Sequence, residues 1–374
     1  MNLFRNRRCI LPLCAHIWLL GCCTVPVIGQ TTASDSRAGQ KIIVTTAGAE
    51  LKTPEATVWR AYPGEVFEIS LVNGEWLWIR EKGGWLWEGD GVPFDKAISI
   101  TSDRLARSPT AQNYHVRGVV FVAHEQYDRA VQDFSRSLEK SPRNAGVLNN
   151  RGQCQYLSKN YSAAIADFSE AVRLDPSHFV AFNNRALAHI ALQDYPSALS
   201  DIRRALELNP KYPEALLNRG VVYEKSGHSQ IAISDYTAAI AIDGKYSAAY
   251  GNRAFSYRTL RRYRDAVSDL RTAMRLSPES FEPVNDLAFT LATAKDDNIR
   301  DVVRALVLAE RAESMAGEDH WNILDTLAVA RAAVNDFEGA SRSLGQAIEL
   351  APENEKAKLL AHQEQIAAGM HVRE

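Results

Sequence analysis

Cysteine is scarce outside the first 23 residues of this sequence. Four of the five cysteines (Cys9, Cys14, Cys22 and Cys23) lie in the N-terminal segment, which leaves only Cys154 in the remainder. A chain with one internal cysteine cannot be held together by a disulfide framework. Its stability therefore has to come from a packed core.

A basic excess is also missing. The chain has 43 lysines and arginines against 45 acidic residues, for a formal net charge of −2. Residues 1–21 include three arginines and no acid, so their removal takes the charge to −5. Nucleic acid is therefore not an expected partner. Hydrophobic residues make up 46% of the chain, which is typical of a folded protein.

The motifs of enzymes and metal proteins are missing too. The sequence has no Walker-type loop and no dinucleotide-binding glycine motif. The histidines between His115 and His320 are scattered, without the spacing of a zinc site. We interpret Cys154 as a packed small residue rather than a nucleophile. We therefore predict a protein without catalytic activity, metal or cofactor.

Residues 1–29 have the pattern of an export signal. Arginines precede an apolar run over residues 9–23, which is too short for a membrane span. Two processing sites are open. Residues 19–22 resemble a bacterial lipobox, which would make Cys22 the lipidated first residue, and the alternative is ordinary cleavage after Gly29. Both predict an exported protein of the periplasm or cell envelope, and the first adds a lipid anchor in the membrane.

A 34-residue repeat that starts at Ala111 decides the fold class. Position 20 of every unit is alanine, and positions 8 and 27 carry small residues. Small residues at these places let two antiparallel helices approach closely. Proline at position 32 of most units ends the second helix. The seven units begin at Ala111, Ala145, Phe179, Pro213, Ser247, Phe281 and Trp321.

The larger residues of each unit form an apolar face. Position 17 is Tyr127, Tyr161 and Tyr195 in the first three units. A single helix pair cannot bury such a face, so stability has to come from the stacking of neighbouring units. The sixth unit is five residues longer around 294–300, which predicts a longer turn between its two helices.

These features resemble the tetratricopeptide repeat family over residues 111–354. The resemblance implies an all-α superhelical solenoid whose groove binds a protein or an extended peptide. Residues 93–110 match the second helix of a repeat, and we expect them to cap the first unit. A polar helix over residues 355–370 is expected to cap the last one.

Residues 41–92 have a different, β-rich pattern. Asn73-Gly74 is a strong hairpin signal between short alternating runs. The order of runs and turns resembles a bacterial SH3-like barrel, so the predicted fold class is α+β multidomain, with a small all-β SH3-like barrel before the solenoid. Five of the seven tryptophans lie between Trp59 and Trp87. We interpret them either as packing residues or as the lining of a groove for peptide or cell-wall ligands.

Arginine and aspartate recur with the same 34-residue step. Arginine occupies position 7 and aspartate position 23, where the family commonly has apolar packing residues. Together they predict a structural, bidentate ion pair between helices. The partner of Arg185 stays open between Asp167 and Asp201. The residues expected in such pairs are Arg151, Arg185, Arg219, Arg253, Asp167, Asp201, Asp235 and Asp269.

Asparagine recurs at position 6 of repeats 2–5. A row of amides on the wall of a groove can bind an extended peptide backbone, because each amide has both a donor and an acceptor. The alternative is ordinary solvation of a helix surface. Apolar residues at positions 9 and 12 would form the groove floor. The candidate groove residues are Asn150, Asn184, Asn218, Asn252, Tyr156, Leu187, Ile190, Val221 and Phe255.

Two functions fit these patterns. The first is a non-enzymatic scaffold or adaptor of the bacterial cell envelope, which holds a protein segment in the groove of the repeats. The second is an accessory cell-wall module, in which residues 41–92 bind peptidoglycan and the repeats act as a spacer.

Overall fold

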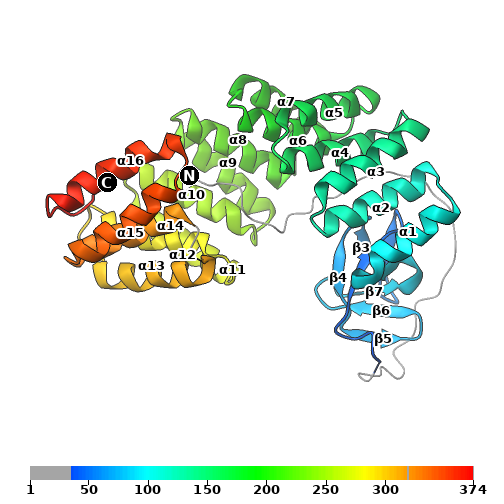
Figure 1. The fold of residues 1–374 in the computed structure, drawn as a ribbon, viewed down its shortest axis with the longest axis horizontal. Helices are drawn as coiled ribbons and strands as arrows, with labels where there is room; N and C mark the ends of the chain where they lie inside the picture. The colour runs from blue at the N-terminus through cyan, green and yellow to red at the C-terminus, as the bar shows by residue number, and fades with distance from the viewer. Residues whose placement is uncertain (1–34, 318–319, 374) are drawn as a thin grey trace. The chain divides into compact units, whose positions relative to one another are not determined.

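The computed structural model describes residues 35–317 and 320–373 (Figure 1). The predicted export segment and Cys22 lie outside these residues. Within them, no helix combines the length and the apolar character that a membrane crossing needs. The chain forms two compact units, with the boundary between Leu208 and Asn209.

The N-terminal unit begins with a small β region, as the sequence predicts. Its strands pair antiparallel in two open sheets, in the orders β4-β1-β8 and β3-β2-β7-β6-β5. The strands are β1 (Lys41–Val44), β2 (Ala49–Lys52), β3 (Thr57–Ala61), β4 (Val66–Glu68), β5 (Leu71–Asn73), β6 (Trp76–Ile79), β7 (Gly84–Trp87) and β8 (Gly91–Pro93).

Alternation along the strands builds the core of this region. Leu77 and Ile79 of β6 and Leu86 of β7 are buried on one side of their hairpin. The turn that joins β5 to β6 includes Gly74 with φ +61°, in the left-handed region that glycine adopts without strain. The Asn73-Gly74 hairpin predicted from the sequence is thus present.

The β region packs against the first helices of the same unit. Ile43 and Val92 share a buried cluster with Ala97 and Val120. A Cβ atom on Gly64 would lie 2.7 Å from Val119, so this turn needs glycine for its close approach to the helix. The packing fixes the β region to the start of the repeats.

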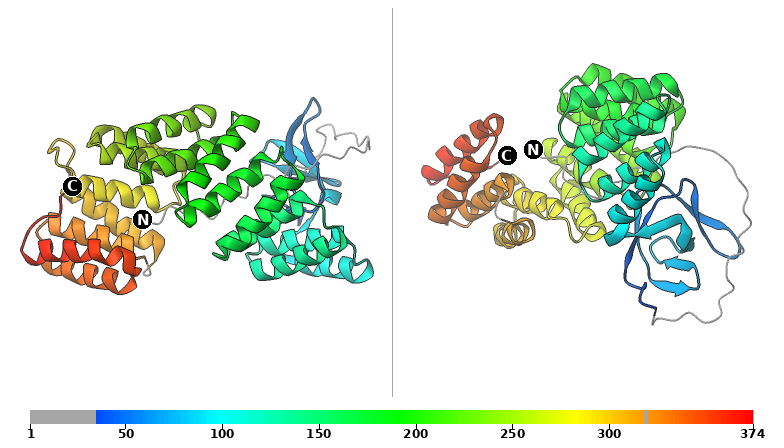
Figure 2. Two further views of the ribbon diagram at one scale, coloured as in Figure 1. Left: turned by 90° about the horizontal axis from the view of Figure 1, so that it is seen from above. Right: turned by 45° about the vertical axis from the view of Figure 1, so that its right-hand side comes forward.

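The remainder of the described chain is helical, and Figures 1 and 2 show the helices as antiparallel pairs. The N-terminal unit includes α1 (Ala97–Arg107), α2 (Ala111–Ala123), α3 (Tyr127–Lys140), α4 (Ala145–Leu157), α5 (Tyr161–Leu174), α6 (Phe179–Ala191) and α7 (Tyr195–Leu208). The C-terminal unit includes α8 (Pro213–Lys225), α9 (Ser229–Ile242), α10 (Ser247–Thr259), α11 (Tyr263–Leu276), α12 (Glu282–Thr293), α13 (Val302–Ala316), α14 (Trp321–Ala333), α15 (Phe337–Leu350) and α16 (Glu353–Ala367).

The residue at position 8 is matched to the residue at position 24 of the same repeat. A Cβ atom on Gly152 would lie 2.8 Å from the ring of Phe168, and one on Gly220 would lie 2.5 Å from the ring of Tyr236. Repeat 3 has Ala186 at position 8 and the smaller Ile202 at position 24. Glycine therefore stands where the facing helix carries an aromatic ring, because a larger residue there would clash with the ring.

The turn between the helices of a repeat has the same backbone conformation along the chain. Position 15 has positive φ in Glu125, Lys159, Gln193 and Arg261. Asn335 of repeat 7 shares it, and Gly227 of repeat 4 takes it without a steric cost. The helix pairs thus close with a tight turn that the packing of the repeat enforces.

The last repeats depart from the regular pattern in two places. The sixth has a longer connection between its helices, from Thr293 to Val302, as its insertion predicts. After the seventh, α16 covers the array by burying Leu359 and Ile366. The Nδ1 atom of His362 lies 2.6 Å from Oδ1 of Asp325 on α14, which fixes this helix in register.

Candidate functional site

Each position-7 arginine binds the aspartate of its own repeat, 16 residues later. Arg185 donates from Nη2 and Nε to the two carboxylate oxygens of Asp201, at 2.6 Å and 2.8 Å. Asp167 binds Arg151 in the same way. The pairs are Arg117–Asp133, Arg151–Asp167, Arg185–Asp201, Arg219–Asp235 and Arg253–Asp269.

Most of these arginines also reach the preceding repeat. The Nη1 atom of Arg151 donates to the hydroxyl of Ser135, that of Arg185 to Ser169, and that of Arg253 to Thr237. One guanidinium group thus joins three helices. The hydroxyl at position 25, which the sequence analysis did not single out, is the signal for this connection.

Burial makes the aspartates depend on their arginines. Asp201 is 5% exposed and its partner is only partly accessible to water. The hydrogen bonds to Asp167 raise the pKa of Arg151 above the ordinary value of arginine, and those to Asp235 do the same for Arg219. The arrangement positions helices and leaves no carboxylate free for chemistry, so these residues are structural.

The first asparagines of the row are buried between helices, contrary to the expectation that they line an exposed groove. Asn150 and Asn184 are each 4% exposed. The amide of Asn184 donates to Oδ1 of Asn149 at 3.0 Å, and that of Asn150 lies 3.1 Å from Nε2 of His115. Burial lowers the pKa of His115 to about 4, so its neutral ring accepts this hydrogen bond near pH 7.

These contacts follow a rule that the sequence contains. Position 6 of one repeat bonds to position 5 of the repeat before it, 35 residues earlier. Asn218 is also buried, at 5% exposure. For Asn252, the residue 35 places earlier is Leu217, which has no acceptor. Among the residues that the structure describes, the amide of Asn252 has no hydrogen-bond partner.

Asn252 lines a cavity of about 250 Å³ between α8, α9 and α10. The predicted groove residues Val221 and Phe255 line it as well, so the structure brings three candidates together. The remaining lining residues are Glu224, Lys225, Tyr236 and Thr259. We call this cavity and its lining the inner groove.

The polar side of the inner groove centres on Glu224, which the sequence analysis did not single out. Its carboxylate accepts hydrogen bonds from Ser256 at 2.5 Å and from Ser229 at 3.0 Å. Glu224 lies on α8, one helical turn after Val221. It occupies position 12 of its repeat, one of the two positions that were predicted to form the groove floor. The groove therefore offers a fixed carboxylate, a free amide and the ring of Phe255.

The other predicted floor residues do not join this cavity. Ile190 is 3% exposed. Tyr156 packs against Phe168 and Ala188, and burial raises its pKa to about 12. Leu187 is half-buried. None of these three side chains lines the cavity.

The tryptophans of the β region divide between packing and exposure. The β6–β7 register pairs Trp76 with Trp87 and Trp78 with Trp85, so the four side chains lie on one face of the hairpin. Trp85 is 4% exposed, whereas Trp87 is 39% exposed. The partly exposed rings form an aromatic face that could contact a ligand.

Nothing in the described residues resembles a catalytic or metal centre. Cys154 is fully buried, and this burial raises the pKa of its thiol to about 12. No group of three or more histidine, cysteine, aspartate or glutamate side chains in the part that the structure describes could hold a metal ion.

Sequence-family models match most of the repeat region. The model described as "Tetratricopeptide repeat" matches residues 115–179, another of the same description matches 213–246 and 247–280, and one described as "TPR repeat" matches 188–227. No curated protein matches the chain.

Solved structures share the fold at low sequence identity. A chain of the "APC/C hetero-tetramer Cut9-Hcn1" matches with a TM-score of 0.57 and 19% identity over 63% of this chain, and only 46% of its own length is covered. A tetratricopeptide repeat protein from Parabacteroides merdae matches with a TM-score of 0.53 and 18% sequence identity. The match covers 72% of this chain and 98% of that one. Yeast Tom70 matches with a TM-score of 0.53 and 15% sequence identity. The match covers 74% of this chain and 59% of that one.

Proposed function

We propose that this chain of tetratricopeptide repeats is a non-enzymatic scaffold that holds an extended protein segment in the inner groove. The family generally mediates protein–protein interactions through the surfaces of its stacked helices. The observation that carries the proposal is the free amide of Asn252 in a cavity beside Phe255. The amide binds a peptide backbone, and the ring packs against an apolar side chain of the segment.

A selected peptide tests this proposal. Peptides are selected from a library on the full-length protein, and the affinity of the best one is measured for the wild type and for two variants. Asn252→Ala should weaken binding by about 1 kcal/mol, the net value of a neutral hydrogen bond, and Phe255→Ala by more. Trp87→Ala is the control and should bind as the wild type does. Unchanged affinity in both groove variants, at unchanged melting temperature, would contradict the proposal.

The aromatic face of the β region favours a second candidate function. Exposed tryptophan rings such as Trp87 stack on the apolar faces of sugars, so we propose peptidoglycan binding by residues 41–92 as the alternative, with the repeats as a spacer. The short antiparallel strands and the Asn73-Gly74 hairpin support an SH3-like assignment for this region. Sedimentation of the full-length protein with purified peptidoglycan, lost in the Trp76→Ala and Trp87→Ala double variant, would favour this function over the first.

We place the protein in the cell envelope on the strength of residues 1–29 and propose Cys22 as a lipidation site. A lipid on Cys22 would keep the protein near the partner whose segment it holds. Cell fractionation checks this placement, since Cys22→Ser should move the protein from the membrane to the soluble exported fraction. Equal distribution of the two forms would indicate ordinary cleavage.

A further inference from the structure

Arginines form a stripe on the exposed side of α11. Arg264, Arg271 and Arg275 follow the spacing of one helix face, and all three are exposed. Repeats 1–4 carry at most one arginine at the three equivalent places. The stripe is therefore a property of repeat 5 and not of the repeat pattern.

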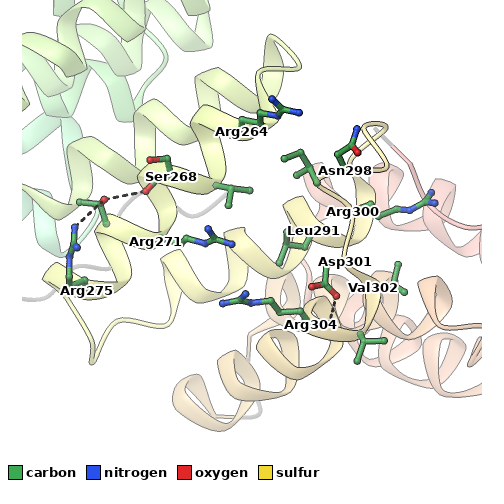
Figure 3. Close-up of a pocket in the computed structure, with 14 residues that line it drawn as sticks. Arg264, Ser268, Arg271, Arg275, Leu291, Asn298, Arg300, Asp301, Val302 and Arg304 are labelled. Atoms are coloured by element: carbon green, nitrogen blue, oxygen red, sulfur yellow. Dashed lines mark hydrogen bonds between the residues drawn. The ribbon is translucent and has the colours of Figure 1, made fainter.

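The stripe forms one wall of a cleft with a volume of about 1020 Å³ (Figure 3). The other wall is the long turn of repeat 6 and the start of α13, with Asn298, Asp301 and Arg304. Figure 3 shows Arg271 and Arg304 reaching into the gap from the two walls. We call this site the arginine cleft.

The arginines of the cleft have few partners in the protein. Among the residues that the structure describes, the side chains of Arg264, Arg271 and Arg304 have no hydrogen bond or ion pair. Arg275 has a weak contact with the hydroxyl of Thr272, at 3.4 Å. The carboxylate of Asp301 already caps α13 by accepting from the backbone amide of Arg304. The cleft therefore has an excess of unpaired positive charge.

The repeat pattern explains why Arg271 is unpaired. Position 25 of repeats 1, 2 and 4 is a hydroxyl residue (Ser135, Ser169 and Thr237), which accepts from the arginine of the next repeat. Repeat 3 has Arg203 at this position. In repeat 5 this position is Arg271, a donor, and position 7 of the next repeat is Leu287, whose side chain has no acceptor for it. The network of arginines and hydroxyls ends here, which leaves a guanidinium group for another partner.

The charge of the cleft selects an anion. Guanidinium groups that share one cleft repel each other, and a bound carboxylate relieves this repulsion with bidentate hydrogen bonds. The chain as a whole carries a formal charge of −2, so a long polyanion meets repulsion from the rest of the surface. A short acidic segment contacts only the cleft, so it avoids this repulsion from the rest of the surface.

We propose that the arginine cleft is a second binding site, which takes an acidic and partly apolar segment of a partner protein. Val302 and Val303 lie beside the arginines, and Val303 is 68% exposed. The volume is at the upper end of the range for ligand pockets and exceeds the needs of a single ion. A peptide with alternating acidic and apolar side chains matches both kinds of lining. The site shares no lining residue with the inner groove.

The test uses a synthetic heptapeptide that alternates glutamate with leucine or valine, and the same peptide with glutamine in place of each glutamate. Fluorescence anisotropy with the full-length protein at low salt should show at least about tenfold tighter binding of the acidic peptide. Arg271→Gln combined with Arg304→Gln should remove most of this preference. Arg204→Gln combined with Arg342→Gln removes the same charge from residues outside the cleft and should retain it.

Several outcomes would overturn the proposal. These are equal binding of the two peptides, equal loss in the control pair, or displacement of the acidic peptide by an RNA oligonucleotide at matched charge. If the cleft variant melts at a lower temperature, Arg264→Gln with Arg275→Gln repeats the test on the two remaining arginines of α11. Phe255→Ala should leave binding of this peptide unchanged, so failure of the inner groove and failure of the arginine cleft are distinguishable.

Discussion

A buried aspartate beside a partly exposed arginine is an asymmetric pair. Asp201 is 5% exposed and has both carboxylate oxygens bound to Arg185, while the arginine retains access to water. Removal of the arginine strands the charge of the aspartate in the core. Removal of both the arginine and the aspartate leaves no buried charge and changes only the packing between the helices.

We therefore expect Arg185→Leu to lower the free energy of unfolding by about 3 kcal/mol, and Arg185→Leu with Asp201→Leu to lower it by less. Urea unfolding followed by circular dichroism measures both. Arg204→Leu is the matched control, since its ion pair with Glu207 is about half exposed and contributes little. The single variant Asp201→Leu completes the comparison. If the double variant loses the sum of the two single-variant losses, this account of the pair is ruled out.

The sequence predicted which residues pair but not how. Asp167 and Asp201 are both within reach of Arg185 in sequence, and only the packing of the two helices in one repeat selects Asp201. The sequence predicted the asparagines either as a peptide-binding row on a groove or as solvated surface residues, and Asn150, Asn184 and Asn218 are at most 5% exposed. Their 34-residue spacing places them on one helix face, but depth depends on the neighbour at position 5, which is polar before Asn184 and apolar before Asn252.

At the scale of the helix pair, the distance between helices is set by the small residue at position 8. Gly152 faces the ring of Phe168, whereas Gly251 on α10 has no heavy atom within 4 Å of its Cβ position. Both lie inside helices, where glycine is unfavourable by about 1 kcal/mol relative to alanine. The two sites differ in the space available and not in their local backbone.

Gly152→Ala should therefore destabilise the protein by about 1–2 kcal/mol, because the clash with Phe168 exceeds the gain in helix propensity. Gly251→Ala should stabilise it by up to about 1 kcal/mol. Thermal and urea unfolding of the two variants provide the comparison. Stabilisation by both substitutions would show that helix propensity, and not packing, dominates at position 8.

Helix positions were predictable because alanine, glycine and proline mark the packing distance and the helix ends in every repeat. The arginine cleft was not predicted, although its stripe and the repeat 6 insertion are both in the sequence. The stripe and the insertion lie about 30 residues apart, and only the packing of α11 against the next repeat brings them together. A comparison of exposed positions between repeats is the signal that finds such a site.

At the scale of the whole molecule, stability comes from contacts between neighbouring repeats, and the proposed binding residues occur where those contacts stop. Asn252 is free because Leu217 cannot accept its hydrogen bond, and Arg271 is free because the side chain of Leu287 has no acceptor either. These two interruptions of the repeat pattern in the C-terminal unit coincide with cavities. We infer that departures from the pattern mark the binding surfaces of this protein.

The most direct test of the inner groove is a photo-cross-link from its edge. The full-length protein carries p-benzoylphenylalanine in place of Thr259, which lines the groove and is exposed, and the control carries it in place of the equally accessible Leu350. A peptide selected on the wild-type protein is added, and the adduct is located by mass spectrometry. We predict an adduct from position 259 and none from position 350. An adduct from position 350 with none from position 259 would contradict the placement of the bound segment.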